Sequence, residues 1–120
     1  MISEPPSVPR VLAFRDDQLV TYVNNEWETL DIQCTVESVY PVHDLEFQLI
    51  SGDTVVSNRQ PGNGYSANSD HTFRVTTVFS VQFSRSYSLT EDGLTCQVYH
   101  QRGNSQSQRL CVTLLGEHYN

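Results

Sequence analysis

Three cysteines, Cys34, Cys96 and Cys111, are the side chains of this sequence with the most evident chemistry. The first two enclose 61 residues, from position 35 to position 95. A disulfide that closed a loop of this length would stabilise the folded chain by about 4 kcal/mol in the chain-entropy model. Such bonds are rare in the cytosol, so a bridge here would indicate secretion. Three reduced, buried thiols are the alternative.

The other reactive residues give little support to metal binding or catalysis. Four histidines are scattered along the chain and no C-x-x-C motif accompanies them, so the sequence predicts no metal site and no cofactor. We expect His100 to be a core residue at a strand end, bonded to a carbonyl. The acidic pairs Asp16-Asp17 and Glu91-Asp92 lack the spacing of a calcium loop and are typical of solvated turns. Because the serines show no nucleophile elbow or triad order either, the sequence indicates a protein that is not an enzyme.

Size and charge narrow the class of protein further. The chain has 120 residues, which suits one domain, and its net charge of −7 disfavours nucleic acid and anionic membranes as partners. No run approaches the ~20 apolar residues of a membrane span, and no signal peptide opens the chain. The opening Met1–Pro6 looks like a start codon placed before an interdomain linker, so we expect a fragment of a longer surface protein. On this interpretation residues 1–6 are a linker, residues 7–115 one domain and residues 116–120 a tail.

Alternation of apolar and polar residues with a period of two dominates the chain, and no helical stripe of useful length appears. It predicts an all-β fold of short strands at Ser7–Phe14, Leu19–Val23, Leu30–Val36, Leu45–Leu49, Thr54–Ser57, Phe73–Phe83, Leu94–His100 and Leu110–Leu114. Pro9 limits the first of these to an edge or a bulge. A loop is expected over 59–70 and a hairpin turn over 103–106. The pattern is that of an antiparallel Greek-key β-sandwich of seven to nine strands.

At Cys34 and Cys96 the chain resembles an immunoglobulin domain, because each cysteine stands on the inward face of its expected strand. The resemblance implies a Cys34–Cys96 disulfide across the two sheets, with Phe47 packed on it where these domains usually place tryptophan. The segment from Thr90 to His100 looks like the corner and sixth strand of constant-type domains, although Leu94 replaces the usual corner tyrosine. The later run from Ser107 to Leu110 is similar to the second domain of nectin and nectin-like adhesion molecules.

One face of the expected sandwich has the composition of an interface centre. Alternation directs outward a set that combines a tyrosine, an arginine and few other charges: Glu46, Gln48, Gln97, Tyr99, Arg109, Cys111 and Thr113. We therefore expect weak self-association through this face, anchored by Tyr99. Cys111 is either a free thiol or the site of an intermolecular disulfide.

The sequence thus predicts an extracellular recognition or spacing module of a cell-surface adhesion molecule or immune-type receptor. A secreted immune effector or viral decoy with the same fold is the first alternative. A carbohydrate-binding sandwich is the second, with Tyr22, Trp27 and Tyr65 as candidate aromatic platforms that nothing in the sequence gathers. No N-glycosylation motif is present, which leaves both outer faces open to a protein partner.

Overall fold

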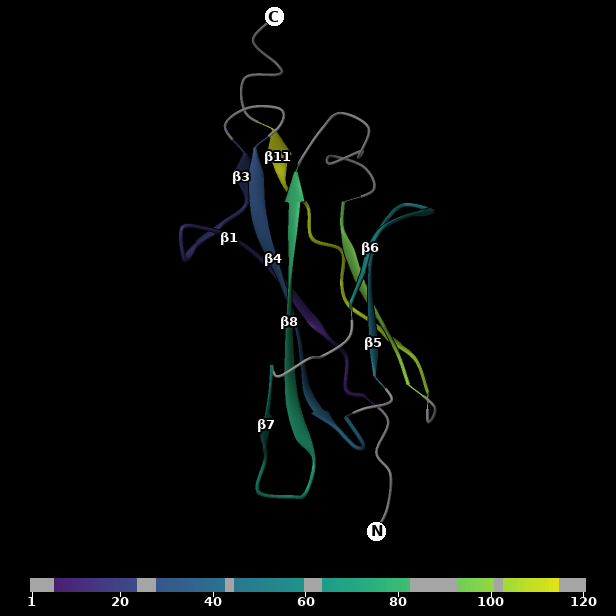
Figure 1. Ribbon diagram of the computed structural model, residues 1–120. Helices are drawn as coiled ribbons and strands as arrows, with labels where there is room; N and C mark the ends of the chain where they lie inside the picture. The colour runs from purple at the N-terminus through teal and green to yellow at the C-terminus, as the bar shows by residue number, and fades with distance from the viewer. Residues whose placement is uncertain are drawn as a thin grey trace, which may run out of the picture.

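The computed structural model describes residues 6–23, 28–42, 45–59, 64–82, 93–100 and 103–114. Over these ranges the chain forms strands and no helix, arranged as two larger sheets that face each other and a small third one (Figure 1). The fold is the expected all-β sandwich. Within the described ranges no helix is long and apolar enough to cross a membrane.

The larger sheet has five strands in the order β2-β1-β4-β8-β7. Its centre is the antiparallel pair of its two longest strands, whose alternating residues give each strand one buried face. The bounds are β1 Arg10–Arg15, β2 Gln18–Val20, β4 Thr29–Val39, β7 Tyr65–Ala67 and β8 Phe73–Gln82. A two-residue turn joins β1 to β2, and both of its residues, Asp16 and Asp17, have positive φ angles of 50° and 66°. This backbone shape suits the right-handed twist of a tight hairpin, and aspartate tolerates it.

The second sheet has four strands in the order β10-β9-β5-β6. The bounds are β5 Glu46–Ser51, β6 Thr54–Arg59, β9 Thr95–Tyr99 and β10 Ser105–Gln106. A third, parallel pair is made by β3, Tyr22–Val23, and β11, Thr113–Leu114. In a seven-strand constant-type domain the corresponding sheet has only three strands. Here β6 adds a fourth strand, so this sheet is broader.

The core lies between the two sheets and is built from the inward residues of both. Its largest fully buried side chains include Phe47 of β5 and Phe79 of β8, together with leucines, isoleucine and valines of the neighbouring strands. The alternation on β8 has the expected register, since Val75, Phe79 and Val81 are at most 2% exposed. Apolar alternation therefore located the core correctly.

Several expected strand boundaries need correction, and the described chain has more strand segments than the seven to nine expected. The first strand begins at Arg10, after Pro9, and is not an edge strand because β2 folds back on it. The expected strand Leu19–Val23 is divided between β2 and β3, which belong to different sheets. The expected loop over 59–70 contains β7, whose residues pair with β8. At the hairpin after β9, the residues Ser105 and Gln106 belong to a strand.

Candidate recognition surfaces

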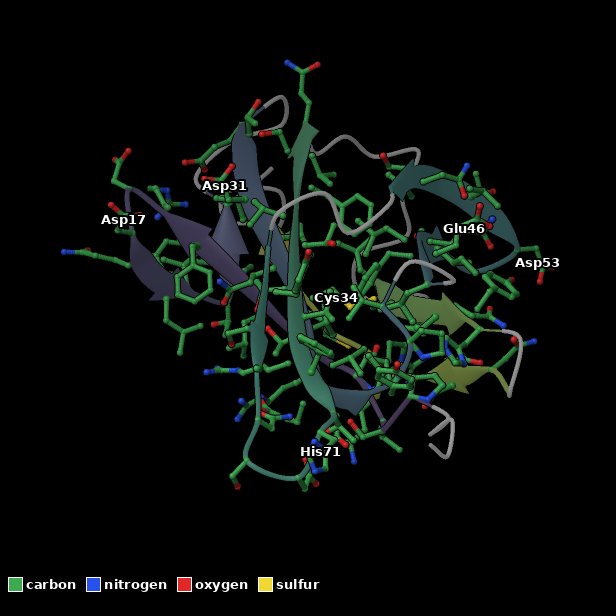
Figure 2. All side chains as sticks on the ribbon, turned by 60° about the horizontal axis from the view of Figure 1, so that its bottom comes forward. Asp17, Asp31, Cys34, Glu46, Asp53 and His71 are labelled. Atoms are coloured by element: carbon green, nitrogen blue, oxygen red, sulfur yellow. A yellow bond between two sulfur atoms is a disulfide. The ribbon has the colours of Figure 1, made fainter. Side chains whose placement is uncertain are left out.

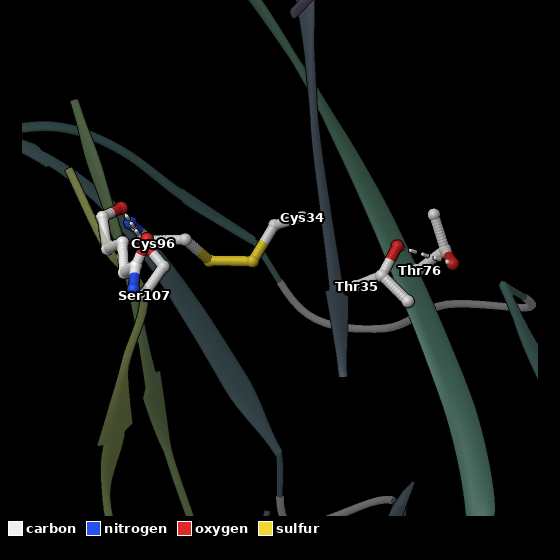
Figure 3. The surroundings of a disulfide bond; sticks show 6 residues. Cys34, Thr35, Thr76, Cys96 and Ser107 are labelled. Carbon is white, nitrogen blue, oxygen red and sulfur yellow. Dashed lines mark hydrogen bonds between the residues drawn. A yellow bond between two sulfur atoms is a disulfide. The ribbon is translucent and has the colours of Figure 1, made fainter. Parts of the chain in front are cut away.

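The disulfide between Cys34 of β4 and Cys96 of β9 joins the two sheets at the centre of the core (Figures 2 and 3). Both cysteines are 0% exposed, and their Cα atoms are 6.4 Å apart. The Ser107 hydroxyl accepts a hydrogen bond from the Cys96 N–H at 2.9 Å and donates one to the Gln108 carbonyl at 2.8 Å. This buried bridge is placed to hold the sandwich together.

The side chains of Phe47 and His100 are buried in the interior of the sandwich. Phe47 is 0% exposed and pairs with Val98, two positions from the pair formed by Leu49 and Cys96. His100 is 6% exposed, and its Nε2 lies 2.9 Å from the carbonyl oxygen of Pro41. The expectation of a carbonyl-bound histidine at a strand end is confirmed. The packing of Phe47 on the disulfide itself stays a prediction.

The outer face of the four-stranded sheet brings together the first four residues of the expected interface. Glu46 pairs with Tyr99 and Gln48 pairs with Gln97 across β5 and β9. The Tyr99 hydroxyl donates to Gln48 Oε1 at 3.0 Å, and Gln48 Nε2 donates to Asn58 Oδ1 at 2.8 Å. The face is therefore a hydrogen-bonded polar surface, held by contacts across three strands.

Of the other three expected residues, Arg109 keeps the outward side that alternation predicts, since its neighbour Leu110 pairs with the buried Leu94. The register shifts by one residue after β10, because three residues separate Gln106 from Leu110 whereas two separate their partners Gln97 and Leu94. Thr113 lies on β11, in the small parallel sheet, and its side chain is outside the described part of the structure. Cys111 is exposed, as the alternation predicts.

Gly93 explains how the chain passes Arg109 at this bulge. Its φ of +61° belongs to the left-handed region, which favours glycine. A Cβ atom here would lie 2.7 Å from Arg109 Cγ and 2.7 Å from the Leu110 carbonyl oxygen. Arg109 thus packs over Gly93, at the end of β9 opposite to the Glu46–Tyr99 pair.

The outer face of the five-stranded sheet carries an apolar patch that the sequence reasoning missed, formed by Leu12, Phe14, Leu19 and Val78. Leu19 is 60% exposed and Val78 42% exposed, and Phe14 pairs with Leu19 on the neighbouring strand. Phe14 and Val78 line one shallow hollow of about 170 Å³ with polar side chains between them. The signal lies in β1, where Val11, Leu12, Ala13 and Phe14 form an unbroken apolar run that leaves apolar side chains on both faces.

Charged and hydroxyl groups surround this apolar patch. Asp31 accepts a hydrogen bond from the Ser80 hydroxyl at 3.2 Å at one end, and Arg10 forms an exposed ion pair with Glu37 at 2.8 Å at the other. Figure 2 shows Asp17 and Asp31 on this side of the sandwich and Glu46 on the opposite side, with Cys34 between them. An apolar centre with a polar rim is the arrangement of a protein interface.

Arg15 fixes the hairpin that carries Leu19. Its guanidinium forms two hydrogen bonds to the Glu28 carboxylate, at 2.5 and 3.0 Å, and lies 5.0 Å from the centre of the Tyr22 ring. Glu28 raises the pKa of Arg15 above its ordinary value. Because these contacts join the hairpin to the start of β4, they hold in place the strand that carries Leu19 of the apolar patch.

The aromatic residues considered for carbohydrate binding do not meet. Tyr22 lies under Arg15, whereas Tyr65 packs edge-on against Phe73 with 5.6 Å between ring centres. Trp27 lies outside the described residues. Over the described ranges no group of three or more histidine, cysteine or acidic residues could hold a metal ion.

Comparison with known proteins agrees with this architecture. The family model of the immunoglobulin C1-set domain matches residues 20–103, which is more than half of the chain. No curated protein matches the sequence.

Proposed function

The chain belongs to the immunoglobulin C1-set family, and from that premise we propose that it is an extracellular protein-recognition module of a cell-surface receptor or adhesion molecule. C1-set domains are in general binding modules without enzymatic activity, and immunoglobulin domains commonly mediate contacts between proteins. The buried Cys34–Cys96 bridge supports the extracellular setting, since such bonds persist in oxidising compartments. A secreted effector or viral decoy remains the alternative carrier of the same domain.

The observation that carries the proposal is the apolar patch of Leu12, Phe14, Leu19 and Val78. Two exposed aliphatic side chains beside an aromatic ring on a sheet face gain free energy when a partner covers them. Among the described residues of the opposite face, Gln48, Asn58 and Tyr99 are joined by hydrogen bonds into a polar surface. The five-stranded sheet is therefore the better binding surface.

A second copy of this chain is the partner that the patch fits. Along the face, Arg10 pairs with Thr35 on one side of the Leu12–Gln33 pair, and Phe14 pairs with Asp31 on the other. A two-fold axis along the Leu12–Gln33 pair would lay Arg10 of each copy against Phe14 and Asp31 of the other. Opposite charges and a cation over a ring would then meet at both ends of the patch.

Sedimentation of matched variants tests this surface. Val78→Asp places a charge in the apolar patch, whereas Val55→Asp places the same charge on the other sheet, at a valine of similar exposure, 47% against 42%. We expect the wild type and Val55→Asp to self-associate at high micromolar concentration and Val78→Asp to remain monomeric. Equal behaviour of all three proteins would contradict the proposal.

Tyr99→Ala and Cys111→Ser test the surface expected from the sequence in the same experiment. If self-association passes through Glu46, Gln48, Gln97 and Tyr99, the tyrosine variant loses it and Val78→Asp keeps it. A dimer that disappears only on reduction or in Cys111→Ser would assign the contact to the exposed thiol.

A role as a spacer within a longer receptor is supported by where the chain enters and leaves the sandwich. Ser7 donates its N–H to the Ser38 carbonyl at 3.0 Å, which ties the entering chain to the end of β4. Strand β11 lies at the opposite end of the sandwich (Figure 1). A domain with this geometry extends a series of domains along one axis. The likeness to the second domain of nectin-like molecules belongs to this part of the proposal.

The extracellular setting has its own test. Protein from its native cell, digested without reductant, should yield the Cys34 and Cys96 peptides joined and Cys111 open to alkylation. Alkylation of all three thiols without reductant would place the protein in a reducing compartment instead.

A further inference from the structure

Four side-chain amides stand in one row across the outer face of the four-stranded sheet. The register pairs Asn58 of β6 with Gln48 of β5, Gln48 with Gln97 of β9, and Gln97 with Gln106 of β10. Each strand of the sheet thus contributes one amide to what we call the amide row. The strands that carry neighbouring amides lie about 4.8 Å apart.

Hydrogen bonds already orient half of the amide row. Tyr99 donates to Gln48 Oε1, and Gln48 Nε2 donates in turn to Asn58 Oδ1. This chain leaves the Asn58 amide nitrogen as a donor at one end of the row, where Asn58 is exposed, and Gln106 is exposed at the other end. Because each amide both donates and accepts, the row can bind groups that do the same.

The charge of the face disfavours an acidic ligand. Among the described side chains of the amide row and of the neighbouring Glu46–Tyr99 pair, Glu46 is the charged one. Its carboxylate and the net charge of −7 repel acidic ligands. A ligand rich in neutral hydroxyl groups matches alternating donors and acceptors without this cost.

The amide row and the adjoining Glu46–Tyr99 pair together offer an area that suits a small ligand. Four strands span roughly 15 Å, and two rows of side chains with their radii cover a similar length, which gives about 200 Å². A stable protein partner needs about 800 Å² on each side. A chain of a few sugar units, by contrast, fits a strip one side chain wide and four strands long.

We propose that the amide row binds a neutral oligosaccharide. The amides bind its hydroxyl groups in sequence across the four strands. The Tyr99 ring, which reaches from β9 toward Gln48 on β5, supplies an apolar surface for the C–H face of one sugar ring. This site is separate from the apolar patch on the other sheet, so the two functions are independent.

Two-dimensional NMR of the ¹⁵N-labelled chain tests the site, because asparagine and glutamine side chains give their own NH₂ signals. The probes are cellohexaose, maltohexaose and chitohexaose, with sialyllactose as an acidic comparison. We expect at least one neutral probe to shift the NH₂ signals of Gln48, Asn58, Gln97 and Gln106 in a saturable way. Sialyllactose should leave them in place.

Matched variants locate the binding. Gln97→Leu should weaken the affinity about tenfold, which corresponds to the loss of one or two hydrogen bonds. Gln33→Leu removes an amide from the other sheet and should bind as the wild type does, as should Val78→Asp. Gln106→Ala, at an exposed edge position, keeps the test valid if Gln97→Leu fails to fold.

The proposal is overturned if no neutral probe shifts these NH₂ signals, if sialyllactose shifts them equally, or if Gln33→Leu weakens binding as much as Gln97→Leu. Retention of sugar binding by Val78→Asp, with self-association lost, would support the two surfaces separately.

Discussion

Gly93→Ala is the substitution whose effect the structure defines most closely. Gly93 lies immediately before Leu94 and β9, buried, with a φ of +61°. The added methyl would lie 2.7 Å from the Leu110 carbonyl oxygen and 2.7 Å from Arg109 Cγ. The arginine side chain can move aside, but the carbonyl cannot move freely, because it accepts the Leu94 N–H at 2.8 Å.

Three contributions set the size of the effect. A left-handed conformation costs an alanine about 1–2 kcal/mol. Forcing a methyl against packed backbone costs about 1–3 kcal/mol more. The smaller entropy of the unfolded alanine chain returns about 0.4–1 kcal/mol. The free energy of unfolding should therefore fall by about 3 kcal/mol, the sum of these three contributions.

Gly52→Ala is the matched control, because Gly52 has the same φ of 61° but lies exposed in the turn between β5 and β6. It bears only the conformational cost, about 1 kcal/mol. Urea unfolding of both variants, with unchanged slopes, measures the difference. If the two variants lose stability equally, the close approach of the Leu110 carbonyl to Gly93 is wrong, and so is the bulge that places Arg109 there.

Three further substitutions probe the core and the turn before β8. Phe47→Ala should lower the free energy of unfolding by about 3–5 kcal/mol, as for other buried phenylalanines, and a melting temperature near that of the parent would show that the β5 register is wrong. Thr77→Val should raise stability by about 1 kcal/mol, because the buried Thr77 hydroxyl has no hydrogen-bond partner among the described residues; a loss of stability in urea unfolding would reveal one. Hydrogen bonds from the Thr72 hydroxyl and N–H lower the pKa of Asp70 below its ordinary 3.8. The ionised Asp70 therefore stabilises the folded chain above that pH, and this contribution is lost as the pH falls through the folded pKa. The stability difference between wild type and Asp70→Asn should therefore shrink in strong acid, and a difference constant from neutral to acidic pH would refute this.

Period-two alternation was enough to predict the core, because a strand with one buried face has apolar residues at every second position. Val75, Phe79 and Val81 on β8 and Leu49 on β5 are buried as the pattern requires. The same argument placed Cys34 and Cys96 on inward faces, where the structure joins them. Local patterning was therefore sufficient to predict the fold class.

Pairing partners could not be predicted from alternation, and the errors follow from this. Thr21 separates two short strands that pair with different neighbours, β2 with β1 and β3 with β11. Nothing local distinguishes this from one strand of five residues. Likewise alternation could not predict the one extra residue between Gln106 and Leu110, where three residues lie opposite the two between Leu94 and Gln97.

Both proposed binding surfaces also depend on which strands pair. The amide row exists because three pairs of strands have matching registers, and Asn58 and Gln106 come from segments far apart in the sequence. The apolar patch needs β2 to fold back on β1 and bring Leu19 beside Phe14. In the sequence these residues are separate polar and apolar positions, and only the sheet gathers them.

The most direct test of recognition through the five-stranded sheet is the NMR spectrum of the unmodified protein at low and at high concentration. Dimer formation through the apolar patch predicts that backbone signals of Leu12, Phe14 and Val78 shift with concentration, while those of Gln97 and Tyr99 on β9 stay fixed. Shifts centred on Gln97 and Tyr99 would move the interface to the opposite sheet. A spectrum independent of concentration throughout would contradict self-recognition by this domain.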